Sequence, residues 1–212
     1  MNLTSLTVVE ARVLGVLIEK SKVTPDAYPL TVNSLTAGCN QKTSREPVMT
    51  LSDAEVQATL EDLRGHTLIM ESYGASGRVL RYAHNFTKVY GLPGAAVDLL
   101  AVLILRGPQT ASELRANCER LHHFADASAV EAYLEDLASR ETGALTLKLP
   151  RQAGAREPRW VHLLCGEPVH SPEMPGVGSA GAPVAASALE ERVARLEQEV
   201  AQLRATLAEW AA

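Results

Sequence analysis

The chain has 212 residues, of which 46% are hydrophobic and 21% are charged, and its formal net charge is −5. This composition can bury one or two ordinary hydrophobic cores. The lack of a long apolar run argues against a membrane span, and Glu10 and Arg12 in the first amphipathic segment argue against a signal peptide. Cys39, Cys118 and Cys165 offer no even disulfide framework, which favours a reducing cytoplasmic location.

The first 91 residues predict three helices followed by a β-hairpin. The first helix is expected over residues 7–21, with Thr7 and Glu10 forming a capping box, and a short second helix over residues 31–39. Ser52 and Glu55 cap a third helix that ends near Gly65. Residues 24–29 contain two prolines and are expected to be extended or turning. Strand-like segments at residues 67–73 and 78–83 flank a hairpin loop.

The second part of the chain repeats this order. Helices are expected near residues 94–106, 111–121 and 127–140, and a hairpin pairs residues 144–149 with 158–164. The third helices are related in sequence, because VQATLEDL at residues 56–63 and VEAYLEDL at residues 130–137 share six of eight positions. Three other blocks match in the same order, namely 13–18 with 99–104, 31–39 with 110–118, and 81–84 with 159–162. Four ordered blocks indicate a duplication.

Helix, short helix, helix and hairpin is the order of a winged helix-turn-helix domain. We therefore predict a mainly α fold with small β-hairpins (α+β), built from two tandem winged-helix domains at residues 1–91 and 92–165. A Pro/Gly/Ala-rich linker at residues 166–187 and a coiled-coil helix at residues 188–212 are expected to follow.

The expected C-terminal helix carries a heptad stripe, which consists of Leu189, Val193, Leu196, Val200, Leu203, Leu207 and Trp210. Valine at heptad position a with leucine at position d favours a parallel two-helix coiled coil, so the stripe predicts a homodimer. The alternative is a lone amphipathic helix that folds back on the domains, because three heptads make only a marginal coiled coil.

Several motifs give the chain a family resemblance. They read LGVLIEK (residues 14–20), TPDAYPL (24–30), NSL (33–35), CNQK (39–42), REPV (45–48), LRGPQT (105–110) and FAD (124–126). With these motifs the chain resembles the YceH family of bacterial proteins over about residues 3–165. The resemblance implies two tandem winged-helix domains and brings no catalytic residues with it.

The sequence contains no convincing catalytic or metal-binding constellation. Cys118, His122 and His123 lack a fourth ligand at a useful spacing, and the equivalent cysteine of the first repeat has no such histidines. His84 and His162 are equivalent in the repeat and are interpreted as packing or hydrogen-bonding residues. No phosphate loop or nucleophile motif is present. We therefore expect a non-enzymatic protein without cofactor or metal.

Winged helices usually place the third helix in the DNA major groove, but both third helices here are acidic. Adjacent carboxylates, Glu61-Asp62 and Glu135-Asp136, would repel phosphates. Basic residues lie instead on the hairpins and on the polar loop of residues 40–47, where they could hold nucleic acid or a partner. The candidate contact residues are Lys42, Arg45, Arg78, Arg81, Lys148, Arg151, Arg156 and Arg159. Alternatively, these cations pair with neighbouring acids.

Two functions therefore remain open. The first is a DNA-binding or transcription-associated dimer that holds duplex DNA through its hairpins, favoured by the usual use of the fold. The second is a protein-interaction module without direct nucleic-acid contact, favoured by the charge pattern. A continuous basic face joining Lys42, Arg45, Arg151 and Arg156 would support DNA binding, whereas arginines paired with acids would support a protein partner.

Overall fold

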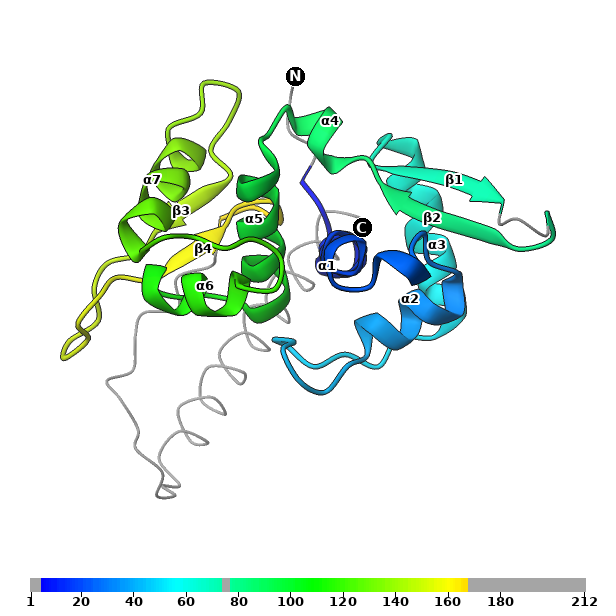
Figure 1. Ribbon diagram of the computed structural model, residues 1–212, viewed down its shortest axis with the longest axis horizontal. Coiled ribbons are helices and arrows are strands. Elements are labelled where there is room, and N and C mark those ends of the chain that lie inside the picture. The colour runs from blue at the N-terminus through cyan, green and yellow to red at the C-terminus, as the bar shows by residue number, and fades with distance from the viewer. Residues whose placement is uncertain (1–4, 74–76, 168–212) are drawn as a thin grey trace, which may run out of the picture. The chain divides into compact units, whose positions relative to one another are not determined.

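The computed structural model describes residues 5–73 and 77–167 (Figure 1). The heptad stripe and nearly all of the predicted linker lie outside the described residues. The domain boundary at residue 91 stays a prediction. Among the described helices, none is long and apolar enough to cross a membrane.

The described residues form a mainly helical fold with two small antiparallel sheets, as expected. The first half contains α1 (Val8–Val23), the 3₁₀ helix η1 (Pro25–Ala27), α2 (Val32–Cys39), α3 (Asp53–Gly65), β1 (Ile69–Tyr73) and β2 (Leu80–His84). The second contains α4 (Phe86–Tyr90), α5 (Gly94–Arg106), α6 (Ala111–Cys118), α7 (Ala127–Ala138), β3 (Thr146–Lys148) and β4 (Trp160–His162). Residues 24–29 were expected to be extended or turning, and three of them form the single 3₁₀ turn η1, which proline permits because the first helical position needs no amide donor.

Reciprocal side-chain caps explain where the helices begin. The Thr7 amide donates to Glu10 Oε2 at 2.6 Å, and the Glu10 amide donates to Thr7 Oγ1 at 3.2 Å. Ser52 and Glu55 form the same capping box at α3. Both boxes were predicted and are confirmed. Each satisfies amide groups that the first turn of a helix leaves without partners.

In each half, one residue of the segment before the second helix forms backbone hydrogen bonds with the second strand of the hairpin. Leu30 pairs with Tyr82 through reciprocal backbone hydrogen bonds of 3.1 and 2.8 Å. Gln109 pairs with Trp160 in the same way, at 3.1 and 2.7 Å. The two bridges lie at matching places in the repeat and give both halves the same local topology.

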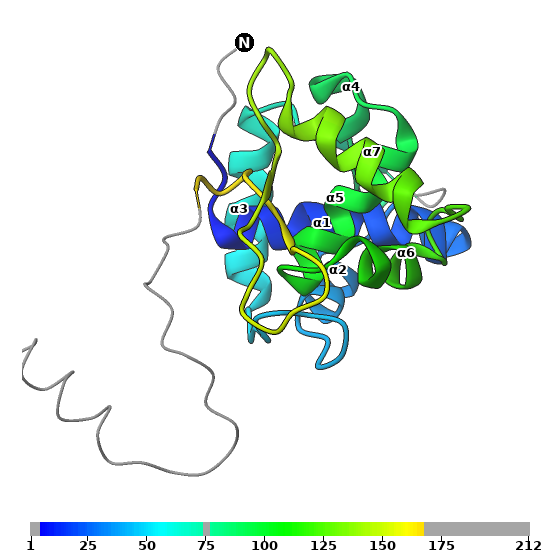
Figure 2. The same ribbon diagram turned by 90° about the vertical axis from the view of Figure 1, so that its left-hand side faces the viewer.

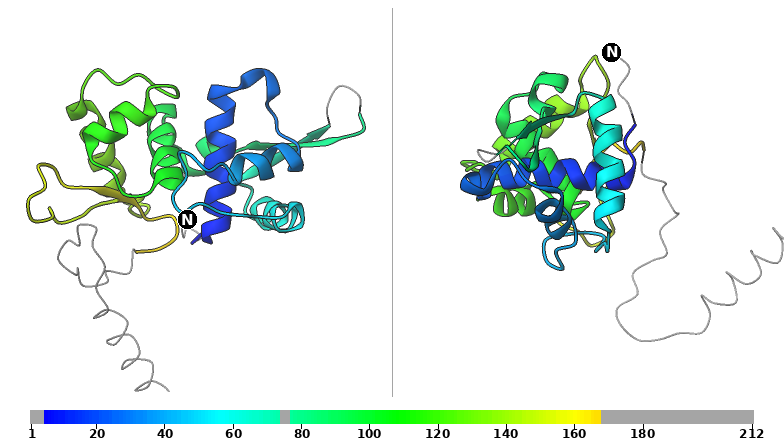
Figure 3. Two further views of the ribbon diagram at one scale, coloured as in Figure 1. Left: turned by 90° about the horizontal axis from the view of Figure 1, so that it is seen from below. Right: turned by 90° about the vertical axis from the view of Figure 1, so that its right-hand side faces the viewer.

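The helix α1 of the first half and the helix α5 of the second lie side by side, and they make the most extensive helix–helix contact (Figures 1 and 3). Both are buried on nearly every face, from Glu10 to Ile18 in α1 and from Ala95 to Leu105 in α5. A helix that is apolar all round belongs in a core. In Figure 2 the second half faces the viewer, and α6 and α7 lie in front of α5. One hydrophobic cluster includes residues of both halves, so the halves share a core.

Candidate functional site

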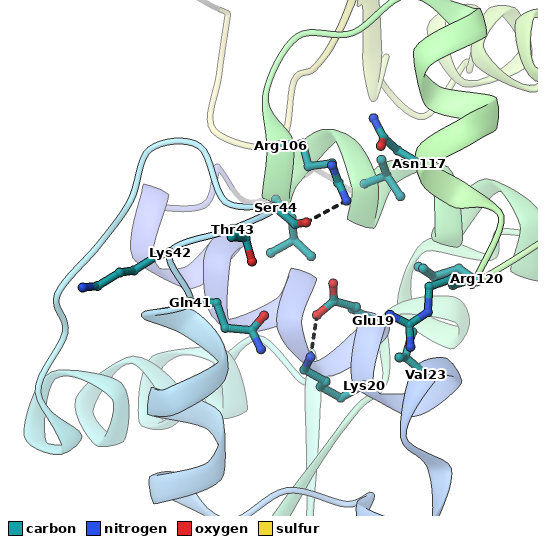
Figure 4. Close-up of a pocket in the computed structure, with 13 residues that line it drawn as sticks. Glu19, Lys20, Val23, Gln41, Lys42, Thr43, Ser44, Arg106, Asn117 and Arg120 are labelled. Atoms are coloured by element: carbon teal, nitrogen blue, oxygen red, sulfur yellow. Dashed lines mark hydrogen bonds and ion pairs between the residues drawn. The ribbon is translucent and has the colours of Figure 1, made fainter.

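A pocket of ≈ 320 Å³ opens beside the contact between α1 and α5. Its wall is formed by the C-terminal part of α1, the loop of residues 41–44, the end of α5, and the end of α6 with the turn that follows it (Figure 4). We call it the α1–α5 pocket. Because it draws on elements of both halves, it exists only when the two halves are packed together.

Three cationic groups from three separate elements surround this pocket. Lys20 comes from α1, Arg106 from the last residue of α5, and Arg120 from the turn after α6 (Figure 4). Lys42 lines the pocket with its stem, but its amino group points away (Figure 4). Glu19 is the acidic residue of the lining. None of Lys20, Arg106 and Arg120 belongs to the contact residues predicted from the sequence.

The Glu19 carboxylate is held by two cations. Arg45 donates to it at 2.7 and 3.2 Å, and Lys20 Nζ lies 3.1 Å from Oε2. Burial raises the pKa of the Glu19 carboxyl, but the hydrogen bonds and charge of Arg45, with Lys20, outweigh burial and hold that pKa below its usual value. Glu19 is therefore an ionised group whose charge is compensated inside the wall.

Arg45 lies inside the protein, in contrast to its predicted place on a contact surface. Its side chain is fully buried in the ion pair with Glu19. It also donates to the Gly38 carbonyl at 3.1 Å, to the Ser44 carbonyl at 2.9 Å and to Gln41 Oε1 at 2.8 Å. All of its nitrogen atoms are occupied within the protein, so we remove Arg45 from the candidate contact residues.

The loop of residues 40–47 is tied to the second half of the protein. Arg106 Nη2 donates to Ser44 Oγ at 2.8 Å, and the Glu46 amide donates to the Leu105 carbonyl at 2.7 Å. Ser44 has a φ of 60°, a left-handed conformation that a non-glycine residue adopts only when its surroundings hold it. The loop is thus a fixed wall of the α1–α5 pocket.

The second hairpin carries two kinds of basic residue. Lys148 Nζ lies 3.6 Å from Glu131 and 3.7 Å from Glu135, and Arg159 lies 3.2 Å from Glu113. These two cations are thus partly neutralised. Arg151 and Arg156 lie in the loop between β3 and β4, are exposed, and make no ion pair with any described residue.

The first hairpin extends in the direction opposite to the second (Figure 3). Arg81 at its base donates to the Pro29 carbonyl at 2.8 Å, as Arg159 donates to the Pro108 carbonyl at 2.6 Å. The two hydrogen bonds are equivalent in the two halves, and each arginine thereby connects its hairpin to the segment before the second helix. Arg78 is exposed and makes no ion pair within the described residues. The free cations of the two hairpins are therefore not brought together on one continuous face.

The described histidines and cysteines do not gather into a metal-binding cluster. Cys118 is buried in the core, where burial raises the pKa of its thiol to about 12, and His123 contacts Glu119 at 2.6 Å. Across residues 5–73 and 77–167, no group of three His, Cys, Asp or Glu side chains could hold a metal ion. His84 and His162 each have a buried Nδ1 atom that finds no hydrogen-bond partner among the residues that the structure describes.

His162 makes the folded state sensitive to acid. Burial lowers the pKa of its imidazole to about 4, below the ordinary value of 6.5 that it regains on unfolding. Between those values the unfolded chain binds the extra proton, so stability is fully present above about pH 6.5 and falls as the pH drops toward 4. We expect a loss of about 2–3 kcal/mol over this range from His162, measured by urea titration at each pH.

The variant His162→Leu tests this origin of the acid sensitivity. It removes this partly buried ionisable group, so the slope of unfolding free energy against pH should become shallower between pH 6.5 and 4. His66→Leu is the matched control, because His66 is exposed at the end of α3 and should leave the slope unchanged. An unaltered slope in His162→Leu would contradict the assignment.

Comparisons with known proteins place the chain in a family. Residues 6–155 match the family described as "Protein of unknown function, DUF480". The chain is 54% identical over 203 residues to a UPF0502 protein of Leptothrix cholodnii, covering 96% of this chain and 89% of the relative. A UPF0502 protein of Acidovorax sp. is 55% identical over 207 residues, with 95% and 91% covered. One of Dechloromonas aromatica is 52% identical over 204 residues, with 96% and 95% covered.

The chain therefore belongs to the DUF480 family. The family membership inferred from the sequence motifs is thus confirmed, under the descriptions DUF480 and UPF0502 and not under the name YceH. The descriptions of the family and of these relatives name no activity.

Proposed function

We propose that each half is a winged helix-turn-helix domain and that the protein is a non-enzymatic, transcription-associated factor that contacts duplex DNA through its second hairpin. The order of helix, backbone bridge, short helix, long helix and hairpin in both halves supports the domain assignment. The expected continuous face of Lys42, Arg45, Arg151 and Arg156 is not formed, because Arg45 is buried against Glu19. The observation that carries the DNA proposal is therefore narrower: Arg151 and Arg156, in the loop between β3 and β4, are exposed and free of acidic partners within the described residues.

The charge pattern limits how DNA would be held. Exposed carboxylates lie on α3 (Glu61 and Asp62) and on α7 (Glu135 and Asp136). Neither helix therefore suits insertion into the DNA major groove, which is flanked by phosphates. Contact through a hairpin loop avoids these carboxylates and relies on the phosphate backbone or the minor groove. Such binding would depend weakly on sequence and would weaken measurably as salt is added.

Binding of a fluorescent DNA duplex across a salt series tests this proposal. Two phosphate contacts predict a slope of log affinity against log salt of about −2 for each hairpin engaged. Arg151→Ala with Arg156→Ala should weaken binding by about tenfold or more and reduce the slope, because each arginine supplies a charge-assisted hydrogen bond.

Lys88→Ala with Arg64→Ala removes the same charge from exposed positions on α4 and α3, and is the matched control. It should bind nearly as well as the original protein. Absence of salt-sensitive binding at low ionic strength would refute the proposal. An equal loss in both double variants would mean that net charge alone accounts for the binding.

A second candidate function is a protein-interaction module. The pairing of Arg45, Lys148 and Arg159 with acids favours it, as does the first hairpin, where Met70, Tyr73 and Val79 are 46%, 70% and 49% exposed. Tyr73→Ser with Val79→Ser should then abolish capture of a specific protein while DNA binding stays absent. Salt-sensitive DNA binding that survives these changes would contradict this second candidate.

A further inference from the structure

We propose that the α1–α5 pocket binds a small phosphorylated molecule. Its volume of ≈ 320 Å³ lies at the lower end of the range for small-molecule sites, about 300–1,000 Å³. It is a concave site whose wall comes from four segments, rather than a patch on one helix. The proposal does not depend on the DNA-binding function.

The arrangement of cations around the pocket suits an anion. Lys20, Arg106 and Arg120 approach the same space from α1, α5 and the turn after α6 (Figure 4). Phosphate oxygens accept several charge-assisted hydrogen bonds at once, and arginine offers two parallel donors to them. Arg106 uses one nitrogen for Ser44 and retains other donors, and Arg120 makes no ion pair or hydrogen bond with a described residue.

The Glu19 carboxylate also lies in the lining and opposes an anion. Its charge is compensated by Arg45 behind the wall and by Lys20 beside it, at 2.7 and 3.1 Å. This triad therefore carries a net positive charge, and Arg106 and Arg120 add to it. The pocket keeps a cationic excess even though the protein as a whole is acidic.

Neutral donors in the lining complete the match to a phosphorylated ligand. Thr43 and Ser44 supply hydroxyl groups, and Gln41 supplies an amide whose oxygen already accepts from Arg45 at 2.8 Å. The Gln41 NH₂ group is thereby directed away from Arg45 and can donate. Val102, Leu105 and Leu121 provide apolar wall for the organic part of a ligand.

Inorganic pyrophosphate titrated into the full chain by calorimetry tests the proposal. At constant ionic strength we expect saturable binding, which Arg106→Ala and Arg120→Ala each weaken by about tenfold or more. Arg120→Ala is the decisive variant, because Arg120 is exposed and its loss breaks no hydrogen bond or ion pair with a described residue. Lys88→Ala removes an exposed charge on α4 and should change affinity by less than about twofold.

Three results would overturn the proposal. These are no saturable binding, unchanged affinity in Arg120→Ala, and an equal loss in Lys88→Ala. Because DNA also carries phosphates, a DNA duplex is tested as a competitor of pyrophosphate. Displacement of pyrophosphate by a duplex whose own binding requires Arg120 would assign the pocket to the DNA backbone and overturn a small ligand. Pyrophosphate binding that survives Arg151→Ala with Arg156→Ala supports a separate site.

Discussion

Replacing Arg45 by alanine is expected to lower the free energy of unfolding by about 3–5 kcal/mol. The Arg45 side chain is completely buried, and its partner Glu19 is only 17% exposed. Removing the guanidinium leaves a carboxylate with insufficient solvation and with Lys20 as its remaining ionic partner. It also releases the Gly38 and Ser44 carbonyls that accept from Arg45.

A double-mutant comparison separates the ion pair from simple loss of packing. Arg45→Ala with Glu19→Ala removes the stranded carboxylate, so it should destabilise by less than the sum of the two single variants. Lys42→Ala in the same loop is the control and should change stability by about 0.5 kcal/mol or less, since Lys42 is exposed. Denaturant titration measures all four. A loss below about 1 kcal/mol in Arg45→Ala would show that the buried pair contributes little.

Replacing Gly15 by valine is expected to disrupt the contact between α1 and α5. Even a β-carbon at Gly15 would lie 2.9 Å from Ile104 Cγ2 and 3.1 Å from Leu105 Cδ2. Valine adds two methyl groups at this point of closest approach, so the helices must separate. Overpacking of a core typically costs about 1–3 kcal/mol and occasionally more, and we expect about 3 kcal/mol here because the clash lies between two helices.

The unfolding transition itself provides a second readout for Gly15→Val. If the contact between the halves is weakened, they no longer unfold together. The slope of the unfolding free energy against denaturant concentration should then decrease, or two separate unfolding transitions should appear. Ile104→Ala makes room opposite the new side chain and should restore part of the loss. Gly65→Ala is the matched control, because a β-carbon at Gly65 meets nothing within 4 Å. A single transition with unchanged stability in Gly15→Val would refute the role of this close approach.

Local features of the fold were predictable from sequence because they depend on neighbouring residues. Capping boxes, proline positions and helical periodicity located the long helices to within a few residues. The short helix α4 was missed, since five residues carry no periodic pattern before Gly91, which ends them in a left-handed conformation. The bridges of Leu30 with Tyr82 and Gln109 with Trp160 involve single residues and likewise leave no pattern.

The candidate sites were only partly predictable because they depend on contacts between distant segments. Sequence could identify Arg151 and Arg156 as basic residues of a loop, but not that Arg45 would turn inward to Glu19. The α1–α5 pocket requires knowing that α1 packs on α5. One signal was available, since the segments 13–18 and 99–105 are apolar without interruption, which is typical of helices buried on all sides.

The helices α1 and α5 hold the same place in the two copies of the repeat, yet they pack against each other. A contact between two equivalent helices is typical of a homodimer, in which the same surface of each subunit meets about a two-fold axis. Here one polypeptide carries both partners, which avoids much of the cost of about 4–15 kcal/mol for bringing two free bodies together. Dilution separates the subunits of an ordinary dimer, but it cannot separate these two halves. A site formed between them therefore persists at any protein concentration at which the chain is folded.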